Sequence, residues 1–265
     1  QHYRWVRNHK ELGMQHFEPA ALSIVQCYQE AVGQSLAKGE LSEPPLPTAE
    51  AVAQSSDPLP IPALYQDLQR AYDEYMTIVN DQKTAPKMAL ASAMVSYRHL
   101  RLDDALKRFS IVMTHYCEAP EAVQAKDGIL VIYQARKDDE AFQNTIDRFV
   151  TQKCGSDKDV ELAKAQRLSK EYDMATRYFK DAEFDKAAVA FYGLYKNAPA
   201  TDENRDDALF SSAVAYEKAG KPKTAIAIYQ EFSQQKEFRK SEYFVEALYR
   251  TAVSHQNAFD YDRAV

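Results

Sequence analysis

Residues 168–199 read LSKEYDMATRYFKDAEFDKAAVAFYGLYKNAP, and alanine and aromatic residues recur in them at helical spacing. Ala175 is followed three residues later by Tyr178, and Ala187 is followed four residues later by Phe191. Residues three or four apart lie on the same face of an α-helix. Alanine lets two helix backbones approach closely, and a nearby aromatic side chain fills the remaining space. The segment therefore predicts two helices packed tightly against each other.

The same alanine signature recurs along the chain at spacings of 36, 46, 38 and 39 residues. An aromatic residue stands four positions after the alanine at Phe109, Phe191 and Tyr229, whereas Thr145 breaks the pattern. A non-repeating helical bundle would give amphipathic helices without such a period. The spacing predicts two-helix repeats that bury their apolar faces against their neighbours. The signatures are Leu102-Asp103-Asp104-Ala105, Asp138-Asp139-Glu140-Ala141, Phe184-Asp185-Lys186-Ala187, Lys223-Thr224-Ala225 and Tyr261-Asp262-Arg263-Ala264.

This pattern resembles the tetratricopeptide repeat (TPR), a helix-turn-helix unit of about 34 residues. The third repeat, counted from Leu168, fits it with Ala175, Tyr178, Phe184, Ala187, Phe191 and Pro199 at positions 8, 11, 17, 20, 24 and 32. The resemblance implies an all-α fold, an α-solenoid of stacked TPR-like repeats. In style the repeats are similar to those of bacterial cell-envelope scaffold proteins.

The pattern divides the chain into three regions. Residues 1–41 are predicted to form an N-terminal TPR-like helical hairpin with its turn at Glu18-Pro19. Residues 42–64 are predicted to be a Pro-rich linker or ordered loop, because their six prolines exclude a helix. Residues 65–265 are predicted to form a TPR-like array, and its first repeat lacks a first helix. The repeats lie near 65–85, 86–121, 122–156, 157–205, 206–244 and 245–265, the last of them truncated.

Two further features concern single repeats. Ser156 and Asp159 have the spacing of a capping box, and no helix breaker follows before Ala182. We therefore expect a long first helix in the repeat 157–205. The repeat 122–156 is the weaker match, because it has Thr145 in place of an aromatic residue and Gly128 inside its first helix.

The composition limits the classes of function. The 265 residues carry a net charge of −6, with 45% hydrophobic and 27% charged residues, which is typical of a globular chain. No cluster of Lys and Arg is dense enough to attract the phosphate backbone of a nucleic acid, and no apolar run is long enough to be a transmembrane segment. The chain starts at Gln1 without a charged-then-apolar leader. We expect a mature or excised piece of a longer protein.

Motifs for catalysis or phosphate binding do not occur in the sequence. His2, His9 and His16 recur at seven-residue intervals. On one helix they would stand about 10.5 Å apart, too far to share a metal ion. We therefore expect no cofactor, no metal site and no enzymatic activity.

In TPR arrays, positions 2, 5, 9, 12 and 13 of each first helix line a concave groove, so the resemblance implies that a protein or peptide binds there. The aromatic and basic residues at these positions suit peptide ligands, although each ring can instead fill the core of the next repeat. TPR receptors that bind chaperone C-termini carry asparagine at position 9, and this chain has other residues there. We therefore do not expect a receptor of that class. The predicted lining is Lys87, Leu90, Met94, Tyr97 and Arg98, then Lys126, Leu130 and Tyr133, then Tyr172, Thr176, Phe179 and Lys180, then Phe210, Val214, Glu217 and Lys218, and last Tyr249.

The sequence thus favours a non-enzymatic scaffold or adaptor that binds protein or peptide partners, with a bacterial envelope complex as its setting. The alternative is a substrate-recruiting or regulatory segment of a larger enzyme whose catalytic domain lies outside these residues. The regions that flank Gln1 and Val265 would discriminate between the two.

The positions of the cysteines in the repeats indicate in which cellular compartment the protein works. Cys117 and Cys154 stand at repeat positions 32 and 33, in turns on the same edge of the array. Packed helices lie about 8–10 Å apart, whereas a disulfide needs Cα atoms within about 7 Å. Turns can close that gap, and Gly155 adds freedom. We hypothesise a Cys117–Cys154 disulfide with Cys27 as a free thiol. Such a bond implies an oxidising compartment such as the periplasm or cell envelope, and reduced thiols would suit the cytoplasm.

Overall fold

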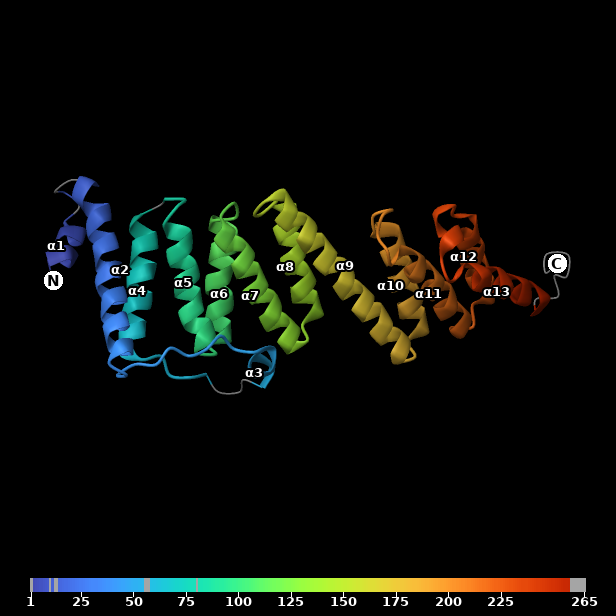
Figure 1. The fold of residues 1–265 in the computed structure, drawn as a ribbon, viewed down its shortest axis with the longest axis horizontal. Coiled ribbons are helices and arrows are strands. Elements are labelled where there is room, and N and C mark those ends of the chain that lie inside the picture. Colours follow the sequence, from blue (N-terminus) through green and yellow to red (C-terminus); the bar gives the residue numbers. More distant parts are fainter. Residues whose placement is uncertain (1, 10, 12–13, 55–57, 80, 258–265) are drawn as a thin grey trace. The chain divides into compact units, whose positions relative to one another are not determined.

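The computed structural model describes residues 2–9, 11, 14–54, 58–79 and 81–257, and within these residues it contains helices and no strand (Figure 1). The chain divides into two compact parts, Gln1–Lys164 and Ala165–Val265. They are called the N-terminal part and the C-terminal part below. The last alanine signature, Tyr261–Ala264, lies outside the described residues.

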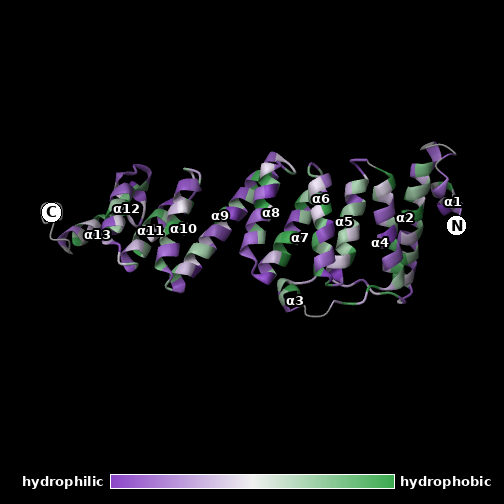
Figure 2. Ribbon diagram, turned by 180° about the vertical axis from the view of Figure 1, so that it is seen from behind, coloured by the Kyte–Doolittle hydropathy of each residue, from purple (hydrophilic) through white to green (hydrophobic). Residues whose placement is uncertain are grey.

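The N-terminal part is a stack of helices in which each helix from α1 to α7 contacts the next one along the chain, except that α3 packs on α7 and α2 contacts α4 directly. Most helices carry hydrophobic residues on one side and hydrophilic residues on the other, as such packing requires (Figure 2). The repeats pair α2 with α4, α5 with α6 and α7 with α8. Its helices are α1 (His2–Asn8), α2 (Met14–Ala37), α3 (Ala49–Gln54), α4 (Ala63–Ile78), α5 (Ala85–Arg98), α6 (Leu102–His115), α7 (Pro120–Arg136) and α8 (Asp139–Thr151), and α9 (Asp157–Lys180) begins there.

The C-terminal part continues the same design from the second portion of α9. Tyr172 and Phe179 of α9 place their rings 5.6 Å from Phe191 and 5.4 Å from Phe184 of α10, measured between ring centres. Helix α10 contacts α11, α11 contacts α12 and α12 contacts α13. The elements are α10 (Phe184–Asn197), α11 (Arg205–Lys218), α12 (Pro222–Gln234), the 3₁₀ turn η2 (Glu237–Lys240) and α13 (Phe244–Asn257).

The turns inside the repeats share one backbone geometry. Leu100, Lys137, Ala182 and Gly220 all have φ between 56° and 72°, in the left-handed region. Each lies two residues before a second helix, α6, α8, α10 or α12. A left-handed residue ends a helix and lets the chain reverse within a few residues. The recurrence of this turn at the same place in four repeats, together with the alanine signature, makes the fold an all-α solenoid of TPR-like hairpins.

The structure corrects the predicted N-terminal hairpin. Its turn is not at Glu18-Pro19, because α2 runs through both residues and its partner α1 ends at Asn8. Pro19 removes one backbone hydrogen bond near the start of α2. The helix continues there because Phe17, Ala20 and Ala21 are buried in the core.

Residues 38–62, called the strap below, form the second correction. Helix α2 packs on α4, so the repeat at 65–85 has a first helix, and the strap is the long turn inside that repeat. The prolines do not exclude every helix, since α3 lies between Pro47 and Pro58 and Thr48 Oγ1 caps it by accepting from Ala51 N at 3.1 Å. Helix α3 packs on α7, as Figure 1 shows. In its described residues, 38–54 and 58–62, the strap is therefore an ordered loop.

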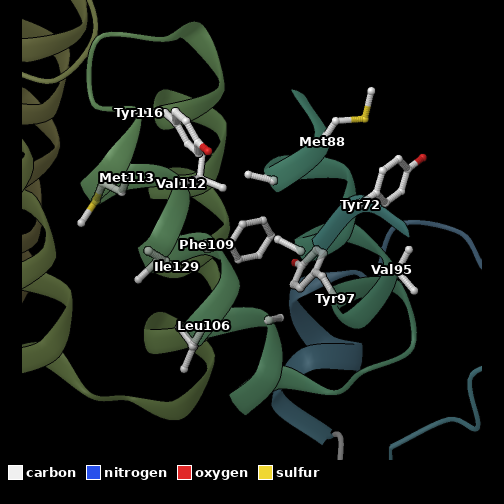
Figure 3. Packing of buried hydrophobic residues seen from close by; sticks show 14 of the residues in the cluster. Tyr72, Met88, Val95, Tyr97, Leu106, Phe109, Val112, Met113, Tyr116 and Ile129 are labelled. Carbon is white, nitrogen blue, oxygen red and sulfur yellow. The ribbon is translucent and has the colours of Figure 1, made fainter. Parts of the chain in front are cut away.

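Phe109 of α6 lies at the centre of the core that α5, α6 and α7 share. Its ring centre is 5.8 Å from that of Tyr97, and the two rings lie next to each other in an edge-on arrangement (Figure 3). On its other side the ring lies so close to Gly128 of α7 that a Cβ there would stand 2.8 Å from a ring carbon. The glycine that weakens the match of this repeat thus allows α7 to approach Phe109.

Gly128→Ala is therefore expected to destabilise the protein by about 1–3 kcal/mol. Alanine favours a helix over glycine by about 1 kcal/mol, but the fully buried Phe109 ring has no room to move. Gly33→Ala in α2 is the matched control, because no atom lies within 4 Å of the added Cβ. Urea unfolding should show the two substitutions shifting the midpoint in opposite directions. A stabilising Gly128→Ala would contradict this packing.

Candidate functional site

The first helices of the repeats form the face on which the sequence predicts that a partner binds. In the N-terminal part these helices are α2, α5 and α7. Helices α5 and α7 contact each other directly, and α2 and α5 border one pocket. In the C-terminal part they are the second portion of α9, α11 and α13. We call this surface of each part its first-helix face.

In the N-terminal part, five predicted residues keep access to solvent on this face. Lys87 is exposed, and the half-buried ones are Leu90, Met94, Arg98 and Tyr133. The strap already engages one of them, because Arg98 Nη1 donates to Pro44 O at 2.7 Å and lies 3.2 Å from Glu43 Oε1.

Four predicted groove residues are buried instead, which corrects that part of the prediction. The exposed fractions of Tyr97, Lys126, Leu130 and Phe210 are 7%, 1%, 5% and 9%. Tyr97 packs edge-on against Phe109, and Phe210 stacks on Tyr243 with 4.8 Å between ring centres. The Lys126 ammonium is held 2.9 Å from an Asp127 carboxylate oxygen and 5.3 Å from the centre of the Phe149 ring. These side chains stabilise the repeats and are closed to a partner.

In the C-terminal part, a carboxylate lies among tyrosines. Tyr172 of α9 donates a hydrogen bond to Asp207 of α11. Burial, followed by this bond to the carboxylate, raises the pKa of Tyr172. Burial and the charge of Asp207 also raise the pKa of Tyr243 to about 12. Both phenols therefore stay protonated at neutral pH and can act as hydrogen-bond donors.

The remaining predicted residues of this part lie on α9, α11 and α13. Glu217 accepts from Arg250 Nη1 at 2.9 Å, and the Lys218 ammonium stands 5.8 Å from the centre of the Phe179 ring. Thr176 is half-buried, while Lys180 and Tyr249 are exposed. Sequence reasoning missed Asp207, Tyr243 and Arg250. Asp207 stands at repeat position 2, so the pattern used for the other repeats could have found it.

Cys117 and Cys154 are joined by a disulfide, with their Cα atoms 4.6 Å apart. The bond links the turn after α6 to the turn after α8, and Gly155 N donates to Cys117 O at 2.7 Å. Beside it, Ser156 and Asp159 form the predicted capping box: Ser156 N donates to Asp159 Oδ2 at 2.9 Å and Asp159 N to Ser156 Oγ at 3.3 Å. Cys27 is a free, exposed thiol.

Among the residues that the structure describes, no three His, Cys, Asp or Glu side chains are grouped so that they could hold a metal ion. None of the helices formed by these residues has the length and apolar character needed to cross a bilayer.

Known proteins resemble this chain only at a low level. No protein-family model matches the sequence, and no curated protein is significantly similar to it. The solved TPR domain of P58(IPK) aligns with a TM-score of 0.34 and 15% identity over 95% of this chain and 62% of that domain. BtubC (BKLC) from P. vanneervenii aligns with a TM-score of 0.32 and 13% identity over 82% of this chain and 88% of its own. The fold assignment rests on the helices and turns described above, and a TPR-like fold suggests protein partners.

Proposed function

We propose that this protein is a non-enzymatic scaffold that binds protein or peptide partners on its first-helix faces. One asymmetry supports this proposal. Most aromatic side chains on first helices keep solvent access, with Phe17, Tyr97 and Phe210 as buried exceptions. The accessible ones include Tyr133, Tyr172, Phe179 and Tyr249, whereas second helices bury Phe109, Phe149, Phe191 and Tyr229. Partly exposed aromatic residues beside charged ones are typical of binding surfaces, because a ring gives much contact area at low entropy cost.

Tyr133→Ala and Tyr249→Ala are expected to weaken binding of a captured partner by about tenfold or more each. The partner would be captured on the immobilised full chain from extracts of its own cells, identified by mass spectrometry, and its affinity measured by calorimetry. Ile111→Ala and Val189→Ala are matched controls, because they remove exposed apolar side chains from second helices α6 and α10. Binding that survives the first pair and is lost with the second would place the surface on the opposite face.

We further propose an oxidising compartment, the periplasm or cell envelope, as the site of action. The Cys117–Cys154 disulfide supports it, since cytosolic thiols are kept reduced and structural disulfides persist in oxidising compartments. An envelope scaffold of this kind would hold its partners in a complex outside the cytoplasm.

A further inference from the structure

The strap carries the segment Pro44-Pro45-Leu46-Pro47, which contains the only two prolines of the chain that stand three positions apart. A proline fixes its own φ at about −65° and disfavours the helical region for the residue before it. From Glu43 to Pro47 every residue is a proline or precedes one, and the structure has no helix there. The segment therefore favours polyproline II, an extended left-handed helix with three residues per turn.

The exposure of these four side chains follows the three-residue turn. Pro44 and Pro47 share one edge of a polyproline II helix, and both are half-buried. Pro45 and Leu46 occupy the other two edges and are exposed, Leu46 to 57%. One edge of the segment is thus partly covered by the protein, while the other two present a proline ring and a leucine side chain to solvent.

Contacts at both ends hold the segment in place. Arg98 Nη1 donates to Pro44 O at 2.7 Å. At the other end, Thr48 caps α3, which packs on α7. Among the described residues, no backbone N–H bonds to the carbonyl oxygens of Pro45 and Leu46. The segment is therefore ordered before it meets a ligand, and this preorganisation lowers the entropy cost of binding.

The charges around the segment narrow the class of partner. The side chains of Glu40, Glu43 and Glu50 are exposed, and Lys38 is the only basic residue between positions 38 and 54. Arg98 lies 3.2 Å from Glu43 and offsets one of the three negative charges. A partner that docks here gains from Lys or Arg side chains at the rim of its site, because complementary charges favour association.

We propose that the segment Pro44–Pro47 is a ligand for a partner domain that recognises polyproline II. Such domains hold Pro-rich segments in a groove lined by aromatic side chains and exploit their preformed backbone. Pro45 and Leu46 enter the groove, their carbonyl oxygens accept hydrogen bonds from it, and basic residues at its rim face the three glutamates. The strap thus gives the scaffold a docking element in addition to its first-helix faces.

The first test uses a panel of purified SH3, WW and EVH1 domains, which bind Pro-rich segments in aromatic grooves. Each domain is titrated into the full chain by calorimetry at low and at high salt. We expect saturable binding by at least one domain with a basic groove rim, and weaker binding at high salt because salt screens the charges. Binding by none of the domains, or an affinity that does not fall with salt, would overturn the proposal.

The second test locates the binding within the strap. The double variant Pro45→Ala/Leu46→Ala should weaken binding of that domain by about tenfold or more, because both exposed side chains are lost. Leu59→Ala/Pro60→Ala is the matched control, since it removes an exposed leucine and an exposed proline from the same strap, outside the Pro44–Pro47 segment. Thermal unfolding followed by circular dichroism should show that both variants stay folded. Equal affinities of the two variants for the domain would refute the assignment.

Discussion

Replacing both Cys117 and Cys154 by serine is expected to lower the free energy of unfolding by about 4 kcal/mol. The bond closes a loop across a sequence separation of 37 residues, and restricting a loop of this size in the unfolded chain accounts for most of that figure. The loop contains α7 and α8, so the bond holds one whole repeat to the turn that precedes it. Cys154 is completely buried, which protects the bond from solvent.

Chemical denaturation followed by circular dichroism measures this loss, and Cys27→Ser is the control because Cys27 is free and exposed. If the chain unfolds in more than one transition, the loss belongs to the transition of the N-terminal part. Alkylation without reduction, followed by mass spectrometry of protein from its own cells, should modify Cys27 alone. Modification of all three cysteines, or equal unfolding midpoints for wild type and double variant, would argue against the bond and its compartment.

The repeat pattern was readable in the sequence because its physical cause is local. Two helices can approach closely only where both carry small residues, so Ala175, Ala187, Ala213 and Ala225 had to recur, and all four are completely buried. The same holds for the capping box at Ser156 and Asp159, whose hydrogen bonds depend on spacing alone.

The first repeat was misread because its two helices are separated by the strap. A repeat with a period near 34 residues is recognised from residues at fixed offsets. The strap lengthens the segment between α2 and α4, so the residues of α2 no longer stand at the offsets expected for a first helix. What fixes the strap is non-local: Leu59 N donates to His99 O at 2.9 Å, and Arg98 holds Pro44. Neither contact leaves a sequence pattern.

The candidate groove was predicted in part for a related reason. A repeat position states which side of a first helix a residue occupies, but not how far its neighbours cover it. Tyr97 and Phe210 occupy groove positions and are buried by Phe109 and Tyr243, while Tyr133 and Tyr249 at related positions keep solvent access. The pocket between α2, α4 and α5 is lined in part by the strap residues Glu43 and Pro44, so the repeat pattern could not indicate it.

Phe109→Ala is expected to lower the free energy of unfolding by about 3–5 kcal/mol. The ring is 1% exposed and touches two helices, at Tyr97 of α5 and at Gly128 of α7. Its removal leaves a cavity that α7 cannot easily fill, because the disulfide links the turns before α7 and after α8, and α3 packs on α7. Ile111→Ala on the same helix is the control, since this side chain is exposed and should cost about 0.5 kcal/mol or less.

Combining Phe109→Ala with Gly128→Ala tests whether this ring is what requires the glycine. In the wild-type background the added methyl group meets the ring and destabilises the protein, as argued above. Without the ring, only the helix propensity remains, so Gly128→Ala should become stabilising by up to about 1 kcal/mol. Urea unfolding of the two single variants and the double variant gives the coupling energy between the sites, which we expect to exceed about 1 kcal/mol. Additive effects would show that Gly128 is needed for a reason other than the approach of α7 to Phe109.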